Sequence, residues 1–107
     1  MNGGKWKGKQ IIPAKLISDA TKPWIKVSED ADGWKTHYGY QTWLQSFPEA
    51  GKAYSVIEFS GNGGQKVLMD KTNDLIVVIT AGNYDAKSLK KHSFDILLDI
   101  VYPSIRD

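Results

Sequence analysis

Six consecutive residues carry the clearest chemical signal in the sequence: Ser60, Gly61, Asn62, Gly63, Gly64 and Gln65. They interrupt a region rich in β-branched and aromatic residues. One interpretation is a tight hairpin turn, because Asn-Gly between two strands is a strong hairpin signal. The other is a strand edge whose glycines leave backbone N–H groups uncovered, as an oxyanion hole requires. The local sequence leaves both interpretations open.

The residues that would use an oxyanion hole do not precede this glycine-rich segment (residues 60–65). The chain is interpreted as lacking an SxxK motif, a YxN tyrosine and a GxSxG elbow. A nucleophile and its base need only meet in space, so a pair formed by Ser60 and His37 stays open. Asp70 and Asp74 flank a predicted turn and are interpreted as turn formers.

Composition excludes several classes of function. The chain has 107 residues, no cysteine and two histidines, His37 and His92, that are far apart in sequence. Disulfides are therefore excluded, and neither a metal site nor a cofactor is predicted. The net charge of +2 gives no indication of a nucleic-acid or membrane partner. The longest apolar run, residues 75–81, is too short to span a bilayer. Because residues 1–9 show no signal peptide, the chain as written is expected in the cytoplasm.

The helices, strands and loops that must position these residues are predicted from the spacing of apolar residues along the chain. Residues 1–11 are expected to form a loop, residues 13–20 a short helix, and residues 24–36 a loop. Alternation from His37 to Gln45 predicts a strand, and further strands are predicted at 54–59, 65–70 and 75–80. The β-branched run at 75–80 predicts a strand covered on both faces.

A helix should close the chain, because a helical spacing joins apolar residues Phe94, Leu97, Leu98, Val101 and Ile105. Pro103 should bend or end this helix near Tyr102. Residues 1–107 are therefore expected to form one α+β domain. It would be an antiparallel meander of three to four strands, with a short N-terminal helix and a C-terminal helix on one face. The tryptophans Trp6, Trp24, Trp34 and Trp43 are expected mainly in packing.

Four segments resemble class C β-lactamase-like serine hydrolases, in the order that this family shows. They are residues 2–13 (NGGKWKGKQIIP), 38–43 (YGYQTW), 60–65 (SGNGGQ) and 74–84 (DLIVVITAGNY). Residues 96–105 resemble the family's closing helix. The likeness covers nearly the whole chain, but only roughly the last quarter to third of a typical family member. It implies part of a β-lactamase/transpeptidase-like fold.

The resemblance also implies roles for individual residues. In this family an SxxK serine is acylated, a YxN-like tyrosine assists proton transfer, and a Lys-Thr-Gly-like strand lines the site. The first two elements would lie upstream of Met1. Glu58, Phe59 and Ser60 occupy the Lys-Thr-Gly place, and Gly61 would supply the oxyanion-hole N–H. A carboxylate at the lysine place would not attract an anionic substrate, so esterase or amide hydrolase activity is expected of the parent enzyme. The implied substrate-binding residues are Glu58, Phe59, Asn62, Gly63, Gly64 and Gln65.

Three hypotheses result. The chain is the C-terminal segment of a serine hydrolase that is inactive alone, a non-catalytic binding or assembly module derived from that fold, or a small enzyme using Ser60 and His37. A separate N-terminal catalytic half is the partner that the first hypothesis requires. An unpaired apolar strand at 75–80 also predicts a homo-oligomer, formed by strand pairing or by exchange of the C-terminal helix. Members of the family are often periplasmic or secreted.

Overall fold

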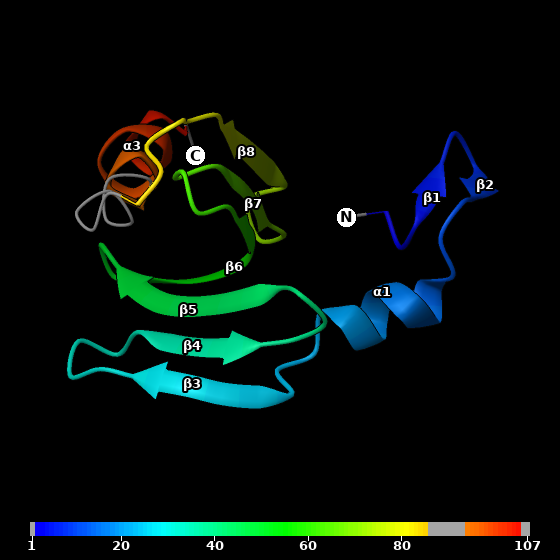
Figure 1. Cartoon of the computed structure of the whole chain (residues 1–107), viewed down its shortest axis with the longest axis horizontal. Helices are drawn as coiled ribbons and strands as arrows, with labels where there is room; N and C mark the ends of the chain where they lie inside the picture. Colours follow the sequence, from blue (N-terminus) through cyan, green and yellow to red (C-terminus); the bar gives the residue numbers. More distant parts are fainter. Residues whose placement is uncertain (1, 86–93, 106–107) are drawn as a thin grey trace.

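A computed structural model describes residues 2–85 and 94–105. Its main feature is one antiparallel sheet whose strands neighbour one another in chain order (Figure 1). The strands are β3 (Ile25–Glu29), β4 (Lys35–Tyr38), β5 (Trp43–Glu49), β6 (Lys52–Ser60), β7 (Lys66–Asp70) and β8 (Leu75–Ile79). The prediction of an α+β meander is confirmed. The expected number of strands, three to four, is wrong, because this sheet has six.

One additional hairpin comes from residues 24–36, which were expected to be a loop. Strands β3 and β4 flank a short turn in which the Asp30 carboxylate accepts hydrogen bonds from the backbone N–H groups of Asp32 (3.0 Å) and Trp34 (2.9 Å). Gly33 adopts φ +85°, a conformation that glycine favours. The polar turn signal was correct, but the alternation of Ile25 and Val27 with polar residues in β3 was missed as a strand signal.

The alternating run that begins at His37 is two strands rather than one. Strand β4 ends at Tyr38, Gln41 adopts φ +54°, and β5 begins at Trp43. Buried Thr42 fixes this turn, since its hydroxyl donates to the Ala20 carbonyl at 2.6 Å. The period of two therefore continues through a reversal of the chain.

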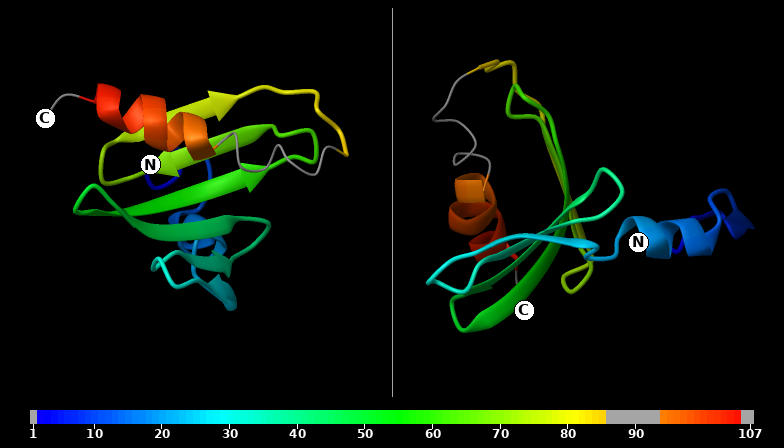
Figure 2. Two further views of the ribbon diagram at one scale, coloured as in Figure 1. Left: turned by 90° about the vertical axis from the view of Figure 1, so that its left-hand side faces the viewer. Right: turned by 60° about the horizontal axis from the view of Figure 1, so that its bottom comes forward.

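The N-terminal part lies apart from the main sheet. The helix predicted at 13–20 is confirmed as α1 (Ala14–Ala20). The expected loop at 1–11 contains a two-stranded hairpin of β1 (Lys5–Trp6) and β2 (Lys9–Gln10). Helix α1 and this hairpin extend away from the sheet on the side opposite the C-terminal helix (Figure 2). None of the α1 residues is buried.

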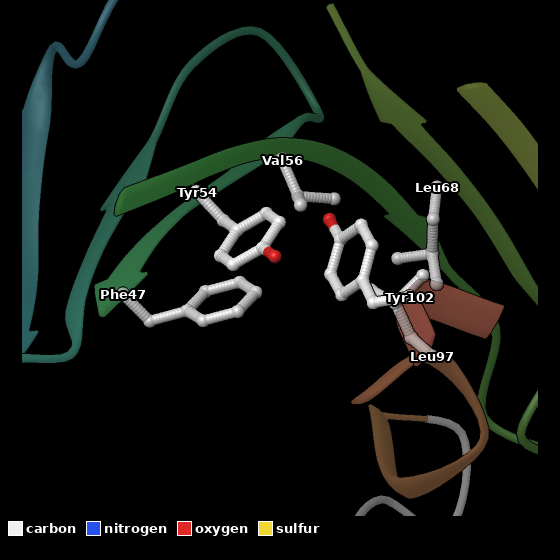
Figure 3. Packing of buried hydrophobic residues seen from close by; sticks show 6 residues of the cluster. All are labelled: Phe47, Tyr54, Val56, Leu68, Leu97 and Tyr102. Carbon is white, nitrogen blue, oxygen red and sulfur yellow. The ribbon is translucent and has the colours of Figure 1, made fainter. Parts of the chain in front are cut away.

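The C-terminal helix covers one face of the sheet, which we call the inner face. It comprises the π-helical turn η1 (Ile96–Val101) and α3 (Tyr102–Ser104), and it ends close to Pro103 as predicted. Its predicted apolar stripe is confirmed: Leu97 is 1% exposed, and the other members pack against the buried cluster. Figure 3 shows that cluster, which consists of Phe47, Tyr54, Val56, Leu68, Leu97 and Tyr102.

Aromatic rings connect the helix to the sheet. The ring of Tyr102 stacks on that of Tyr54 with centroids 4.1 Å apart, and Phe47 stacks on Tyr54 at 5.5 Å. The Tyr102 hydroxyl donates to Asp70 at 2.8 Å. Burial, together with this carboxylate, raises the pKa of Tyr102 above its ordinary value. Asp70 also accepts from the backbone N–H groups of Thr72 and Asn73, which confirms its role as a turn former.

Strand β8 corrects the expectation of a strand covered on both faces. Leu75, Val77 and Ile79 are half-buried on the inner face, whereas Ile76 and Val78 are 55% and 64% exposed. A single helix can cover only one side of a sheet, and α1 extends away from the other (Figure 2). The apolar run of β8 thus faces two different environments.

The helix contact should dominate the stability of the domain. Truncation of Leu97 to alanine is expected to lower the free energy of unfolding by about 2–5 kcal/mol, because it leaves a cavity in a packed core. Ile100, in the same turn η1, is 62% exposed and provides a matched control. Urea denaturation of Leu97→Ala and Ile100→Ala measures both. Equal losses for the two variants would show that the helix is not seated as described.

Candidate functional site

The inner face is apolar near the C-terminal helix but carries charged side chains at one end of β6 and β7. Glu58 and Ser60 alternate with outward residues along β6, and Ser60 pairs in register with Lys66 of β7. Glu58 is 2% exposed and Lys66 is 8% exposed. Burial of this kind is uncommon for either residue type unless the charges are paired.

The three side chains bond to one another. Lys66 Nζ forms an ion pair with Glu58 and donates to Ser60 Oγ at 2.6 Å. The Ser60 hydroxyl donates in turn to the Glu58 carboxylate. Gln45 Nε2 donates to the second Glu58 oxygen at 3.2 Å, and Gln45 is held by a 2.7 Å bond from the Thr36 hydroxyl. We call Glu58, Ser60 and Lys66 the polar cluster.

The polar cluster lines a recess of about 280 Å³. Trp43 and Phe94 form apolar parts of the wall, and Gly61 and Gly64 also line the recess. The Phe94 ring lies 5.5 Å from Lys66 Nζ, a cation–π distance. A hydroxyl, an ammonium group and a carboxylate therefore converge beside aromatic surface, which is a suitable environment for orienting a polar group of a small molecule.

The glycine-rich segment is a turn between β6 and β7. The Gly61 N–H donates to the Gln65 carbonyl at 2.9 Å, and the Gly64 N–H donates to the Gly61 carbonyl at 3.1 Å. The Gly63 N–H donates to Gln65 Oε1 at 3.0 Å. An oxyanion hole at Gly61 stays a prediction, and it requires the bond to Gln65 to open.

The segment after β8 holds this turn from the other side. Gln65 Nε2 donates to the Ala81 carbonyl at 2.7 Å and to the Tyr84 hydroxyl at 3.2 Å. Asn62 Nδ2 donates to Asp85 at 3.1 Å. The turn is thus hydrogen-bonded to residues 81–85, so its position depends on the segment that follows β8.

The structure brings together some of the predicted site residues and separates others. Glu58, Ser60, Gly61 and Gly64 line the recess. Phe59 is 43% exposed and lies on the opposite face, because successive residues of a strand alternate. Asn62, Gly63 and Gln65 hold the turn through the bonds described above.

The pairing of Ser60 with His37 is not supported. His37 is in register with Leu44, which is in register with Ile57, so His37 faces away from Ser60. It lines a different recess, of about 330 Å³, near the end of α1. Lys66, rather than His37, is the basic side chain in contact with the serine hydroxyl.

One SxxK spacing does occur in the sequence, at Ser88 and Lys91. The expectation of a chain without SxxK is therefore wrong as stated. This tetrad follows the glycine-rich segment instead of preceding it, so it does not match the family order. Ser88 and Lys91 lie outside the residues that the structure describes.

Sequence reasoning missed Lys66 and Gln45 as site residues. The signal for Lys66 was present, because it shares the period of two with Leu68 and Asp70 and so falls on their face. A hairpin turn at 61–65 would then have placed it opposite Ser60. Gln45 gave no comparable signal, since its neighbour across the sheet depends on the pairing of β5 with β6.

Comparisons with known proteins identify no relative: no protein-family model, curated protein or solved structure matches the chain. Within residues 2–85 and 94–105, no helix is long and apolar enough to cross a membrane. The same residues contain no group of three or more His, Cys, Asp or Glu side chains arranged to hold a metal ion.

The conformation of Gly64 generates a test of the turn. Its φ of +89° is strained for any other residue, so Gly64→Ala should lower the free energy of unfolding by about 1–2 kcal/mol. Gly82 has open space at its Cβ position and no such φ, which makes Gly82→Ala the control. Thermal unfolding compares them. A Gly64→Ala variant as stable as Gly82→Ala would contradict the turn geometry.

The ion pair generates a second test. Lys66→Met should destabilise the fold by about 3–5 kcal/mol, because it leaves the Glu58 carboxylate buried without its cation. Adding Glu58→Leu should recover most of that loss, since an apolar pair replaces both charges. Chemical denaturation of the single and double variants gives the coupling free energy. Additive losses would mean that the two charges do not interact in the fold.

Proposed function

We propose that the chain is the C-terminal segment of a serine β-lactamase-like hydrolase of the esterase or amide hydrolase class. In this proposal the recess beside the polar cluster forms part of the substrate site. The acylated serine of an SxxK motif and the tyrosine of a YxN motif come from a separate N-terminal catalytic half. The chain alone is then inactive.

One observation carries the proposal: two of the three residues at the Lys-Thr-Gly place, Glu58 and Ser60, line a recess together with glycines of the turn that follows. Glu58 and Ser60 lie two positions apart at the end of β6, and Gly61 and Gly64 of the turn that follows also line the recess. A substrate carbonyl seated there would lie beside Ser60 and the Lys66 ammonium group. These are hydrogen-bond donors of the kind that stabilise developing negative charge.

The charge of the polar cluster refines the substrate class. A carboxylate at the place of Glu58 is not expected to attract anionic substrates, and Lys66 lies beside it and neutralises its charge. The pair has no net charge and also no surplus cation with which to attract a carboxylate. An uncharged ester or amide fits this recess better than an anionic β-lactam, in agreement with the hydrolase class proposed.

A non-catalytic binding or assembly module is the second candidate, and the hydrogen bonds of the glycine-rich turn favour it. The N–H groups of Gly61, Gly63 and Gly64 all donate within the turn. Among the described residues, no buried side-chain nitrogen or oxygen lacks a partner. A site closed in this way suits a structural role, unless a partner opens it.

The isolated chain should not hydrolyse p-nitrophenyl acetate or nitrocefin above the rate measured with buffer. The reason is that the Ser60 hydroxyl donates its hydrogen bond to a carboxylate already bound to Lys66 and Gln45, and His37, the histidine that the structure describes, faces away from it. Absorbance assays of the purified chain measure hydrolysis. A fluorophosphonate probe, followed by intact mass spectrometry, detects any serine that is activated as a nucleophile.

Ser60→Ala and Ser88→Ala are the matched variants for this assay. If the chain hydrolyses either substrate and one of these substitutions abolishes the activity, the proposal is wrong and the chain is a small autonomous enzyme. Labelling of Ser88 would instead assign a nucleophile to the one SxxK tetrad of the sequence. No hydrolysis and no labelling in all three proteins is the expected result.

A further inference from the structure

The two edges of the main sheet differ in how they are protected. Strand β3 is one edge and β8 is the other, and no further strand of the described residues pairs with either. An edge strand presents backbone N–H and C=O groups that can pair with another chain. Proteins usually obstruct such edges with charges, prolines or bulges.

Edge β3 carries these obstructions. Its pairing with β4 is interrupted by an irregularity between Lys26 and Ser28. Lys26 forms an ion pair with Glu29 at 2.5 Å, and Lys35 of the adjacent strand lies 3.4 Å from the same carboxylate. Another strand that paired with β3 would have to accommodate an irregular backbone and charged side chains.

Edge β8 carries none of them. Leu75 to Ile79 contains no charged residue and no proline, and all of its residues pair with β7 in one unbroken register. Ile76 and Val78 are also largely exposed on the outer face. The strand therefore combines an open edge with apolar side chains that gain from being covered.

We propose that β8 pairs antiparallel with β8 of a second copy of this chain, which joins two sheets into one. The inference goes beyond the proposed function and does not rest on it. A two-fold axis through Val77 places Leu75 opposite Ile79 of the partner and Ile76 opposite Val78 of the partner. Every central pair is apolar, and two-fold symmetry makes the contact self-limiting.

The charges that flank β8 agree with a second copy as the occupant. Asp74, the charged residue before β8, lies in the preceding turn at φ +49°, so the antiparallel register places no like charges opposite each other along the paired residues 75–79. Parallel pairing in register would place each Asp74 beside its own copy. The sequence of the strand thus fits itself in the antiparallel orientation.

Paired charges test this register directly. In Ile76→Lys/Val78→Lys, lysines lie opposite lysines in both symmetric pairs, and the dimer should weaken about tenfold or more. In Ile76→Lys/Val78→Glu, each lysine lies opposite a glutamate, and the dimer should be retained. The two variants carry charges at the same exposed positions, and the facing residues of β7, Met69 and Val67, are uncharged.

Sedimentation equilibrium of the full chain at micromolar concentration is the measurement, with circular dichroism to show that each variant is folded. The wild type should approach twice the 11.9 kDa chain mass. Val27→Lys on the β3 edge is the control and should leave the dimer unchanged. If the double lysine variant does not fold, mixing the single variants Ile76→Lys and Val78→Glu, which are complementary across the axis, should still give heterodimers.

Three outcomes would overturn the proposal. A wild type that is monomeric throughout would show that β8 does not bind a second copy and would leave its edge to a different partner. A dimer equally stable in both charge variants would place the contact elsewhere, as exchange of the C-terminal helix would. A dimer weakened only by Val27→Lys would assign the contact to β3.

Discussion

The packing of a single helix on a six-stranded sheet is the constraint on which the rest of the structure depends. Leu97 and Tyr102 lie against Tyr54 and Leu68, and this contact produces the buried core. Because only one helix is present among the described residues of the C-terminal part, only the inner face is covered. Polar groups on that face must find partners within the chain, while apolar groups on the outer face stay exposed.

The polar cluster is a consequence of this arrangement. Glu58 and Lys66 occupy the same face as Leu68, where an unpaired charge would cost several kcal/mol. Their ion pair, with Ser60 and Gln45, removes that cost and leaves a neutral group of donors and acceptors beside aromatic rings. Apolar residues of similar size would serve stability at least as well, so the charges agree with a role in binding or chemistry.

Sequence reasoning succeeded where period or turn chemistry is strong. The helix at α1, the turn after β7 and the C-terminal apolar stripe follow from such local signals, while the turn before β7 was one of two interpretations left open. It failed where the pattern depends on tertiary pairing. Strand β3 is exposed along its whole length and, among the described residues, pairs only with β4, and the two faces of β8 became distinguishable only once the helix was placed.

The site was predictable in part for the same reason. Ser60 and the glycines stand out because their types are unusual between strands. Sequence reasoning missed Lys66 because a lysine at the start of a strand is ordinarily exposed to solvent. Its partner across the turn is Ser60, a neighbour that only the hairpin register reveals. Register also separates His37 from Ser60, which no residue type or spacing in the sequence indicated.

The central proposal is that this sheet completes a hydrolase site whose nucleophile lies in a separate catalytic half. The most direct test is to co-express the chain with the polypeptide encoded immediately upstream of the Met1 codon, and to measure p-nitrophenyl acetate hydrolysis by the purified complex. The account predicts that this polypeptide carries SxxK and YxN, that only the complex is active, and that Ser60→Ala in the present chain lowers the activity. An upstream sequence without these motifs, or a stable complex without hydrolysis, would contradict it.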